Sequence, residues 1–165
     1  MLWRLRPEMR ALFQKDPYEF QKWAIGLVPR AFPHQEKRGA DTEIDGVLRF
    51  KDDAKDPKRC VIQVKGGKVG VKEIRDFRGV IEREKATLGL FITLQRPTGP
   101  TRREADSVGF YTTPLGNRRI ARLQIRTIAQ LLEGDAFLIP SAALLYGVKQ
   151  AAEIRKDPGQ EELDL

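Results

Sequence analysis

The sequence predicts one α/β domain of three layers, in which helices cover both faces of a central mixed sheet. Segments with the period of a strand alternate along the chain with segments that have the period of a helix. Strands over 44–50 and 60–65 are separated by a polar turn, so we expect an antiparallel hairpin. An apolar strand over 88–94 follows a helical segment, and such a crossover predicts parallel pairing. The length of 165 residues suits a single domain.

Residues 1–15 mix apolar and basic side chains, but no capping residue defines an element there, and we interpret them as an arm or linker. A helix is expected to follow. Asp16 can cap it, Pro17 suits its first turn, and Glu19 is favoured near its positive end. Apolar residues then recur at helical spacing over 20–27 before a proline ends the pattern.

The strand over 44–50 alternates in polarity, so its two sets of side chains are expected on opposite faces of the sheet. One set is Ile44, Leu48 and Phe50, and the other is Asp45, Val47 and Arg49. Residues 51–58 read as a polar turn to the strand over 60–65. Period two places Gln63 and Lys65 on the same face of that strand.

The remaining elements continue the alternation of helices and strands. They are a helix over 70–87, the strand over 88–94, a short helix opened by a capping box at 101–104, a strand over 121–125 and a helix over 127–132. The domain is therefore expected to span 16–134. Residues 135–156 are expected to form a C-terminal helix that packs on the body or on a partner. Residues 157–165 are expected to form an acidic, disordered tail.

The charge distribution predicts an anionic partner. The net charge is +7, and because the last nine residues hold four acids and no base, the rest of the chain carries +11. A basic body with a sequence pI near 9.7 favours DNA or another nucleic acid. A basic surface with no such partner is the alternative.

Composition also excludes several classes of protein. No stretch approaches the ~18 consecutive apolar residues of a membrane span, and the first ten residues do not read as a secretory signal. A single cysteine, Cys60, allows no internal disulfide, and a cytoplasmic location is expected. With one histidine, His34, which we place in a surface loop, no zinc pattern is present.

Four residues carry the candidate chemistry. Hydrolysis of a phosphodiester needs charge neutralisation and an activated water, which a carboxylate-bound Mg²⁺ and a nearby cation supply. Asp45 on one strand and Gln63 and Lys65 on the next are close enough across a hairpin to share a site. Glu19 adds a carboxylate if its helix packs over the hairpin. Each residue alone reads equally well as a turn, strand-end or helix-end residue, so the prediction depends on their combination.

The order of these motifs resembles the PD-(D/E)xK nuclease superfamily, and especially its Mrr-like restriction endonuclease branch. The resemblance is carried by the helix with Glu19, the approach Gly39-Ala40-Asp41-Thr42-Glu43-Ile44-Asp45-Gly46 and the strand Val61-Ile62-Gln63-Val64-Lys65. Later segments extend it over about residues 16–133. It implies a restriction-endonuclease-like fold with three α/β/α layers and a metal-dependent deoxyribonuclease. Segments 16–28 and 80–85 also look like the nuclease-like module at the C-terminal end of some DNA methyltransferases, which implies a modification-linked role.

The resemblance implies a role for each site residue. Asp45, the Gln63 side-chain oxygen and the Val64 carbonyl would bind Mg²⁺, with Mn²⁺ as a substitute. Glu19 would hold a second ion or the first ion's water, and Lys65 would activate the attacking water. The products would be a 5′-phosphate and a 3′-hydroxyl, and cutting both strands implies a homodimer.

One position departs from the superfamily pattern. Gln63 is neutral where most members have an acid, so slow or conditional cleavage is expected, and a catalytically silent DNA-binding or docking module is the alternative. A junction resolvase is a weaker one. Candidate contacts to the DNA backbone are Lys68, Lys72, Arg75, Arg102, Arg103, Arg118, Arg119 and Arg122. Asp41 and Glu43 are interpreted as solvent-exposed. The sequence discloses neither the target sequence nor a dependence on base modification.

Overall fold

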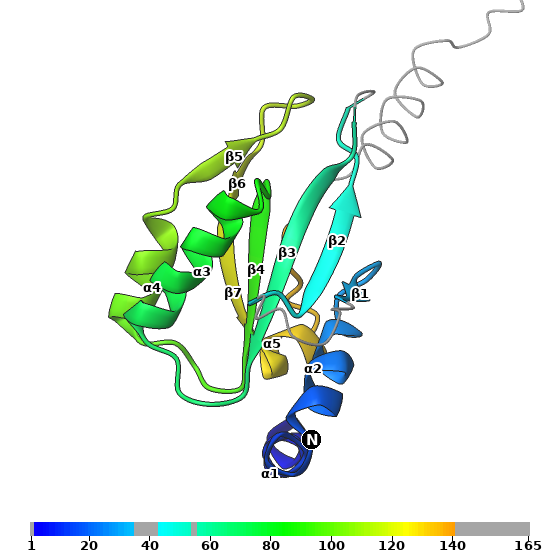
Figure 1. The fold of residues 1–165 in the computed structure, drawn as a ribbon, viewed down its shortest axis with the longest axis vertical. Coiled ribbons are helices and arrows are strands. Elements are labelled where there is room, and N and C mark those ends of the chain that lie inside the picture. The colour runs from blue at the N-terminus through cyan, green and yellow to red at the C-terminus, as the bar shows by residue number, and fades with distance from the viewer. Residues whose placement is uncertain (1, 35–42, 54–55, 141–165) are drawn as a thin grey trace, which may run out of the picture.

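A computed structural model of the chain describes residues 2–34, 43–53 and 56–140 (Figure 1). The elements in chain order are α1 (Leu2–Lys15), α2 (Pro17–Ile25), β1 (Phe32–Pro33), β2 (Gly46–Phe50), β3 (Lys58–Lys65), α3 (Val71–Arg83), β4 (Leu88–Thr93), α4 (Gly99–Asp106), β5 (Phe110–Thr112), β6 (Arg119–Ala121), β7 (Leu123–Thr127) and α5 (Ile128–Leu132). No helix in these ranges is long and apolar enough to cross a membrane.

Five strands form a mixed sheet in the order β1-β2-β3-β4-β7. The β1, β2 and β3 strands pair antiparallel, whereas β3, β4 and β7 are parallel. The predicted hairpin and the predicted parallel crossover are both confirmed. The carboxyl ends of β3, β4 and β7 therefore meet at one end of the sheet, which we call the carboxyl edge, and β2 begins there.

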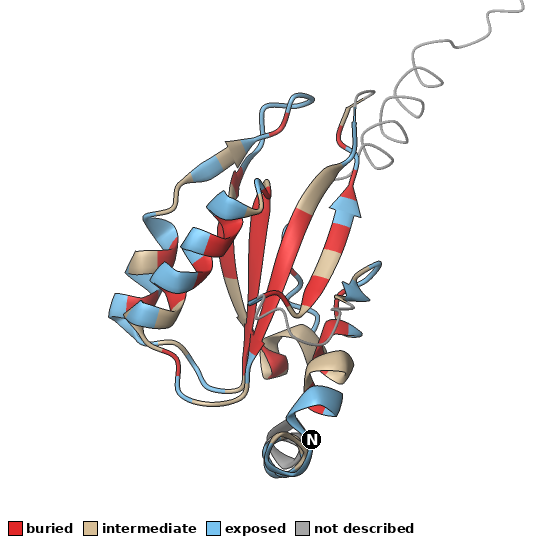
Figure 2. Ribbon diagram, viewed as in Figure 1, coloured by how far each residue is buried: buried red, intermediate tan, exposed pale blue. Residues whose placement is uncertain are grey.

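Two apolar clusters cover the two faces of the sheet. Residues of α2 and α5 pack with Cys60, Ile62 and Val64 on one face, which we call the α2 face. Residues of α3 and α4 pack with Val61 and Phe91 on the other, the α3 face. Figure 2 shows β3 and β4 buried over most of their length, and α3 and α4 buried only on the sides that face the sheet. The predicted three-layer α/β/α architecture around a mixed sheet is confirmed.

Local sequence signals explain where two helices begin. The Asp16 side chain accepts a hydrogen bond from the Glu19 backbone N–H at 3.1 Å, as its capping role requires. At α5 the Thr127 hydroxyl accepts from the Gln130 N–H at 3.1 Å, and the Gln130 side chain accepts from the Thr127 N–H at 2.8 Å. Gly134 then takes φ +90°, which ends the helix.

Several predicted boundaries are corrected. The α4 helix is capped by Thr98 rather than Thr101, and Thr101 is buried in its first turn. The α3 helix ends at Arg83 rather than at residue 87. The β2 strand starts at Gly46, so Ile44 lies beyond the alternating segment and packs on the α3 face instead of sharing the face of Leu48 and Phe50.

Tertiary packing creates elements that local patterns do not reveal. Residues 2–15 form the helix α1, although no cap marks it, and Met9, Leu12 and Phe13 pack against the α2-face cluster. The strand expected over 121–125 is divided into β6 and β7, and β5 pairs with β6 in a second, small sheet. Residues 137–140 are not helical, and the rest of the predicted C-terminal helix and tail lies outside the described residues.

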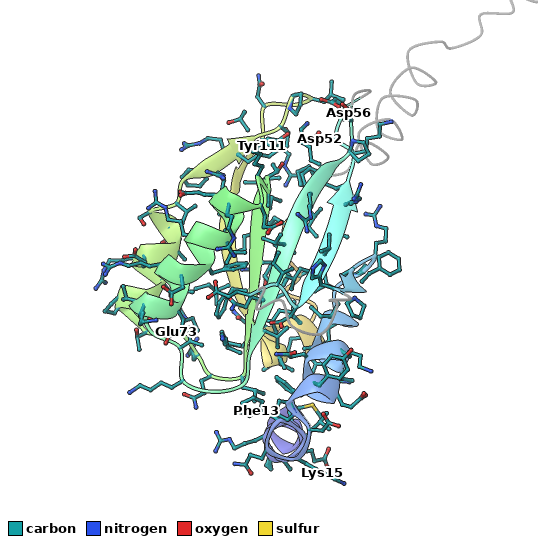
Figure 3. The ribbon with its side chains drawn as sticks, viewed as in Figure 1. Phe13, Lys15, Asp52, Asp56, Glu73 and Tyr111 are labelled. Carbon is teal, nitrogen blue, oxygen red and sulfur yellow. The ribbon has the colours of Figure 1, made fainter. Side chains whose placement is uncertain are left out.

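The turn between β2 and β3 is not simply a polar loop. Asp52 is fully buried, pairs with the Lys58 ammonium group at 2.5 Å and accepts a hydrogen bond from the Tyr111 hydroxyl at 2.5 Å. Figure 3 shows Asp52 and Tyr111 together at the end of the sheet opposite the carboxyl edge. We call Asp52, Lys58 and Tyr111 the clasp, because they join the β2–β3 hairpin to β5.

Candidate active site

Asp45 is held at the start of β2 by three hydrogen bonds. Its backbone N–H donates to the Ile62 carbonyl at 2.9 Å, and its own carbonyl accepts from the His34 N–H at 2.9 Å. The carboxylate Oδ2 accepts from the Val64 N–H at 2.7 Å. The chain therefore fixes this carboxylate beside the last residues of β3, at the carboxyl edge.

The position of Gln63 follows from the register of β2 and β3. Gly46 pairs with Ile62, so the next position along the hairpin sets Asp45 opposite Gln63, and opposite residues point to the same face. Gln63 is only 6% exposed, and no hydrogen bond joins its side-chain amide to another described residue. Its side-chain oxygen is therefore available to accept from, or ligate, a bound group.

Lys65 completes the predicted group at the end of β3. By alternation Gln63 and Lys65 share the face of Val61, which packs on the α3 face. Lys65 is exposed, and no ion pair joins it to a described residue. The structure thus brings Asp45, Gln63 and Lys65 to the same face and the same edge of the sheet.

The Val64 carbonyl faces the same place. The N–H and C=O of one strand residue point to the same neighbouring strand, and alternate residues point to opposite neighbours. The Val64 N–H is directed at Asp45, so its carbonyl is directed that way too. The Lys65 carbonyl, by contrast, accepts from the Leu94 N–H on the β4 side at 3.3 Å.

Glu19 is not brought into this group by any contact among the described residues. Its carboxylate lies 2.7 Å from the Lys22 ammonium group, and both side chains are exposed. The buried residues of α2, among them Phe20 and Ala24, pack on the α2 face, which is the opposite side of the sheet from Lys65. A role for Glu19 stays a prediction.

The structure adds His34 to the neighbourhood of the site. Pro33 pairs with Gly46, and the His34 N–H bonds the Asp45 carbonyl, so the lone histidine lies beside Asp45. The sequence offers no sign of this, because the strand that places His34 has only two residues and one of them is a proline.

The donor atoms fit a hard divalent cation. Carboxylate, amide and carbonyl oxygens are the ligands that Mg²⁺ and Mn²⁺ accept. Within the described ranges no three His, Cys, Asp or Glu residues lie close enough to hold a metal ion together, and Asp45 is the carboxylate that the described contacts place beside the end of β3. A single charged ligand implies modest affinity.

The predicted DNA-contact residues fall into two groups. Lys72 is paired with Asp76 at 2.7 Å and Arg75 with Glu104 at 3.0 Å, while the Arg119 guanidinium stacks 4.2 Å from the Phe110 ring centre. The Asp76 carboxylate raises the pKa of Lys72. The remaining predicted contacts make no ion pair with a described residue. They are Lys68, Arg102, Arg103, Arg118 and Arg122.

Comparisons with known proteins agree with this architecture. The fold is similar to that of the DNA modification-dependent restriction endonuclease AspBHI, with a TM-score of 0.56 and 19% sequence identity. The likeness covers 91% of this chain and 40% of AspBHI, so the chain spans less than half the length of that protein. No curated protein matches the sequence. The Mrr_cat family model, described as restriction endonuclease, matches residues 12–115, which include β2, β3 and the whole candidate site. Since that match extends over more than half of the chain, the protein belongs to the Mrr_cat restriction endonuclease family.

Proposed function

We propose that the protein is a metal-dependent DNA endonuclease whose site is formed by Asp45, Gln63 and Lys65. The observation that supports this most is the 2.7 Å hydrogen bond between the Asp45 carboxylate and the Val64 N–H, because it fixes the acid against the Gln-Val-Lys strand. Family membership supports a nuclease, and the basic body supports DNA as the substrate.

Each residue has a distinct role in this proposal. Asp45, the Gln63 oxygen and the Val64 carbonyl would hold Mg²⁺, which when bound neutralises charge developing on the phosphate. The Lys65 ammonium group would donate a hydrogen bond to a phosphate oxygen and orient the attacking water. The backbone bond to Val64 restrains the Asp45 carboxylate before substrate arrives, so less reorganisation is needed at the reaction.

Nicking of supercoiled plasmid in Mg²⁺ or Mn²⁺ tests the proposal. Asp45→Asn and Lys65→Met should each lower the nicking rate by about 10²–10³-fold, the usual effect of removing one group that stabilises transition-state charge. Both changes conserve size and leave the sheet backbone unaltered.

Two matched changes serve as controls. Asp56→Asn and Lys85→Met remove the same charges from exposed positions outside the site and should leave the rate unchanged. Full activity in both site variants would reject the assignment of Asp45 and Lys65.

A catalytically silent DNA-binding module is the second candidate. It is favoured by the neutral Gln63 and by the ion pair of Glu19 with Lys22, because neither residue then adds a charge that would help Asp45 to hold a metal ion. Salt-sensitive DNA binding without cleavage in Mg²⁺, Mn²⁺ or Co²⁺ would support it, provided that Gln63→Glu does not restore cutting.

A further inference from the structure

Two cavities adjoin at the carboxyl edge and share Arg96 and Gln130 in their walls. The first, of about 470 Å³, is lined by α1, the segment after β4 and α5, and it includes Arg10. The second, of about 360 Å³, is lined by α4 and β7 and includes Arg102 and Arg126. We call Arg10, Arg96, Arg102 and Arg126 with these two cavities the arginine groove.

The charge of this groove is mostly unneutralised. Its walls contain four arginines and two acids, Asp106 and Glu133. Arg96 and Arg102 are exposed, and no ion pair joins either of them to a described residue. They differ in this from Arg75 on α3, whose guanidinium is occupied by Glu104.

Arg126 forms an ion pair with Asp135, which lies outside the two linings, but one of its nitrogens has no hydrogen-bond acceptor within the described ranges. Its side chain is 21% exposed, and its Nη1 donates to the Ile125 carbonyl at 3.0 Å. Its Nε lies 3.3 Å from Asp135 Oδ1, but the geometry is not that of a hydrogen bond, and this buried nitrogen has no hydrogen-bond partner among the described residues. Buried donors nearly always have acceptors, and the guanidinium fork matches phosphate oxygens.

The register of the sheet sets the distance from the candidate active site. Val64 pairs with Ile92 and Ile92 with Arg126, so Arg126 lies level with Val64, two strands away. Adjacent strands are about 4.8 Å apart, which makes the separation about 10 Å along the edge. Val64 and Ile92 pack on the α2 face, so the same register directs the Arg126 side chain to that face, whereas Gln63 and Lys65 lie on the α3 face.

We propose that the arginine groove binds backbone phosphates of the DNA beyond the bond that is cut. The inference rests on the proposed function, because that function supplies DNA as the substrate. Of the DNA contacts predicted from sequence, the groove contains Arg102, and it adds Arg10, Arg96 and Arg126.

Fluorescence anisotropy with a labelled DNA duplex, measured in EDTA over a range of salt concentrations, tests the groove. Each phosphate contact contributes about 0.9 to the slope of log affinity against log salt. The double variant Arg96→Gln/Arg102→Gln should therefore lower that slope by about 2 and weaken binding at least about tenfold at 0.1 M salt. Arg126→Met, tested separately because it is partly buried, should lower the slope by about 1.

The double variant Arg83→Gln/Lys85→Gln is the matched control. It removes the same charge from exposed positions at the end of α3, away from the groove, and should keep the wild-type slope. If the groove variants and the control variant had equal salt slopes and equal affinities for DNA, the proposal that the arginine groove binds DNA would be rejected. Because the assay needs no cleavage, a groove effect in a protein that never cuts DNA would contradict the proposed catalysis and leave the groove standing.

Discussion

At the scale of single residues, Gln63 is the position at which the candidate site has a neutral amide in place of a second acid. Gln63 is 6% exposed and lies opposite Asp45, and its amide bonds no described protein group. A neutral oxygen can ligate a cation but adds no charge to attract it. Weak metal affinity, rather than a misplaced residue, is then the expected limit on activity.

Gln63→Glu should tighten Mg²⁺ binding by roughly tenfold, equivalent to about 1.4 kcal/mol, because it adds a second negative charge to the same position. The variant should be less stable than wild type without metal, since a carboxylate is then buried beside Asp45. Calorimetric titration and the rise in Tm on adding Mg²⁺ measure both effects. A variant with unaltered affinity and no larger metal-dependent rise in Tm would place the metal elsewhere.

The placement of Asp45, Gln63 and Lys65 on neighbouring strands could be predicted from the sequence for a local reason, while their catalytic role stays a prediction. Period two and a short hairpin determine which side chains share a face, and both are readable from the residues of two strands. Glu19 and His34 depend instead on how α2 packs and on a two-residue strand. Those are tertiary properties, and no pattern within the segment reveals them.

At the scale of elements, the clasp joins two hairpins that are far apart in sequence. Burial opposes the charged form of Lys58, but its interactions with Asp52, Tyr111 and Asp53 together outweigh this and raise the pKa of Lys58. Burial, with the hydrogen bond to Asp52, raises the pKa of Tyr111. The acid itself is fully buried, so its charge depends on these partners.

Asp52→Ala should lower the free energy of unfolding by about 2–4 kcal/mol, below the full cost of breaking a buried pair because the Lys58 side chain is 25% exposed. Tyr111→Phe, which removes one hydrogen bond to the carboxylate, should cost about 1–2 kcal/mol. Urea denaturation at pH 7 measures both. If the free energy of unfolding fell by less than 0.5 kcal/mol in both variants, the clasp would not be a stabilising contact.

The clasp also predicts how stability depends on pH. Lys58 and Tyr111 bind their protons more tightly in the folded chain than at their ordinary pKa values of 10.5 and 10.0. Their contribution is therefore complete below about pH 10 and is lost as pH rises further. Unfolding measured from pH 7 to 11.5 should show this alkaline loss in wild type and a smaller one in Asp52→Ala. If wild type and Asp52→Ala lost equal stability at alkaline pH, the loss would come from titratable groups other than Lys58 and Tyr111.

Packing of α1 against the end of β3 depends on Gly66. A Cβ at this position would lie 2.3 Å from the Phe13 ring, so any side chain displaces α1 from the strand that carries Gln63 and Lys65. Gly66→Ala should cost about 1–3 kcal/mol of stability. The double variant Gly66→Ala/Phe13→Ala should cost clearly less than the sum of the single changes, as urea denaturation would measure. Additive losses would mean that the two residues do not contact one another.

At the scale of the whole molecule, the pairing of β2, β3 and β4 was predictable, whereas β1 and the small second sheet were not. Apolar runs and helical periods indicated β3, α3 and β4 because each buries its own side chains. The β5 strand has no fully buried residue, and its position depends on Tyr111 reaching the clasp. The α1 helix likewise becomes stable through its contacts with α2 and α5 rather than through a cap.

One chain contains one candidate site, so cutting both DNA strands requires two encounters or two copies. Nicked circles should therefore accumulate before linear DNA, and the linearisation rate should rise more steeply than the first power of protein concentration. Gel analysis of plasmid products over time checks this. Linear DNA appearing without a nicked intermediate, at a rate proportional to protein concentration, would contradict a single site per chain.

Anomalous diffraction from crystals grown with Mn²⁺ and a DNA duplex is the most direct measurement of the central claim. The account predicts a Mn²⁺ peak within about 2.0–2.4 Å of the Asp45 carboxylate and the Gln63 side-chain oxygen, with the Lys65 ammonium group beside a phosphate. A metal peak at other residues, or a DNA backbone that passes these three side chains without a metal between them, would contradict it.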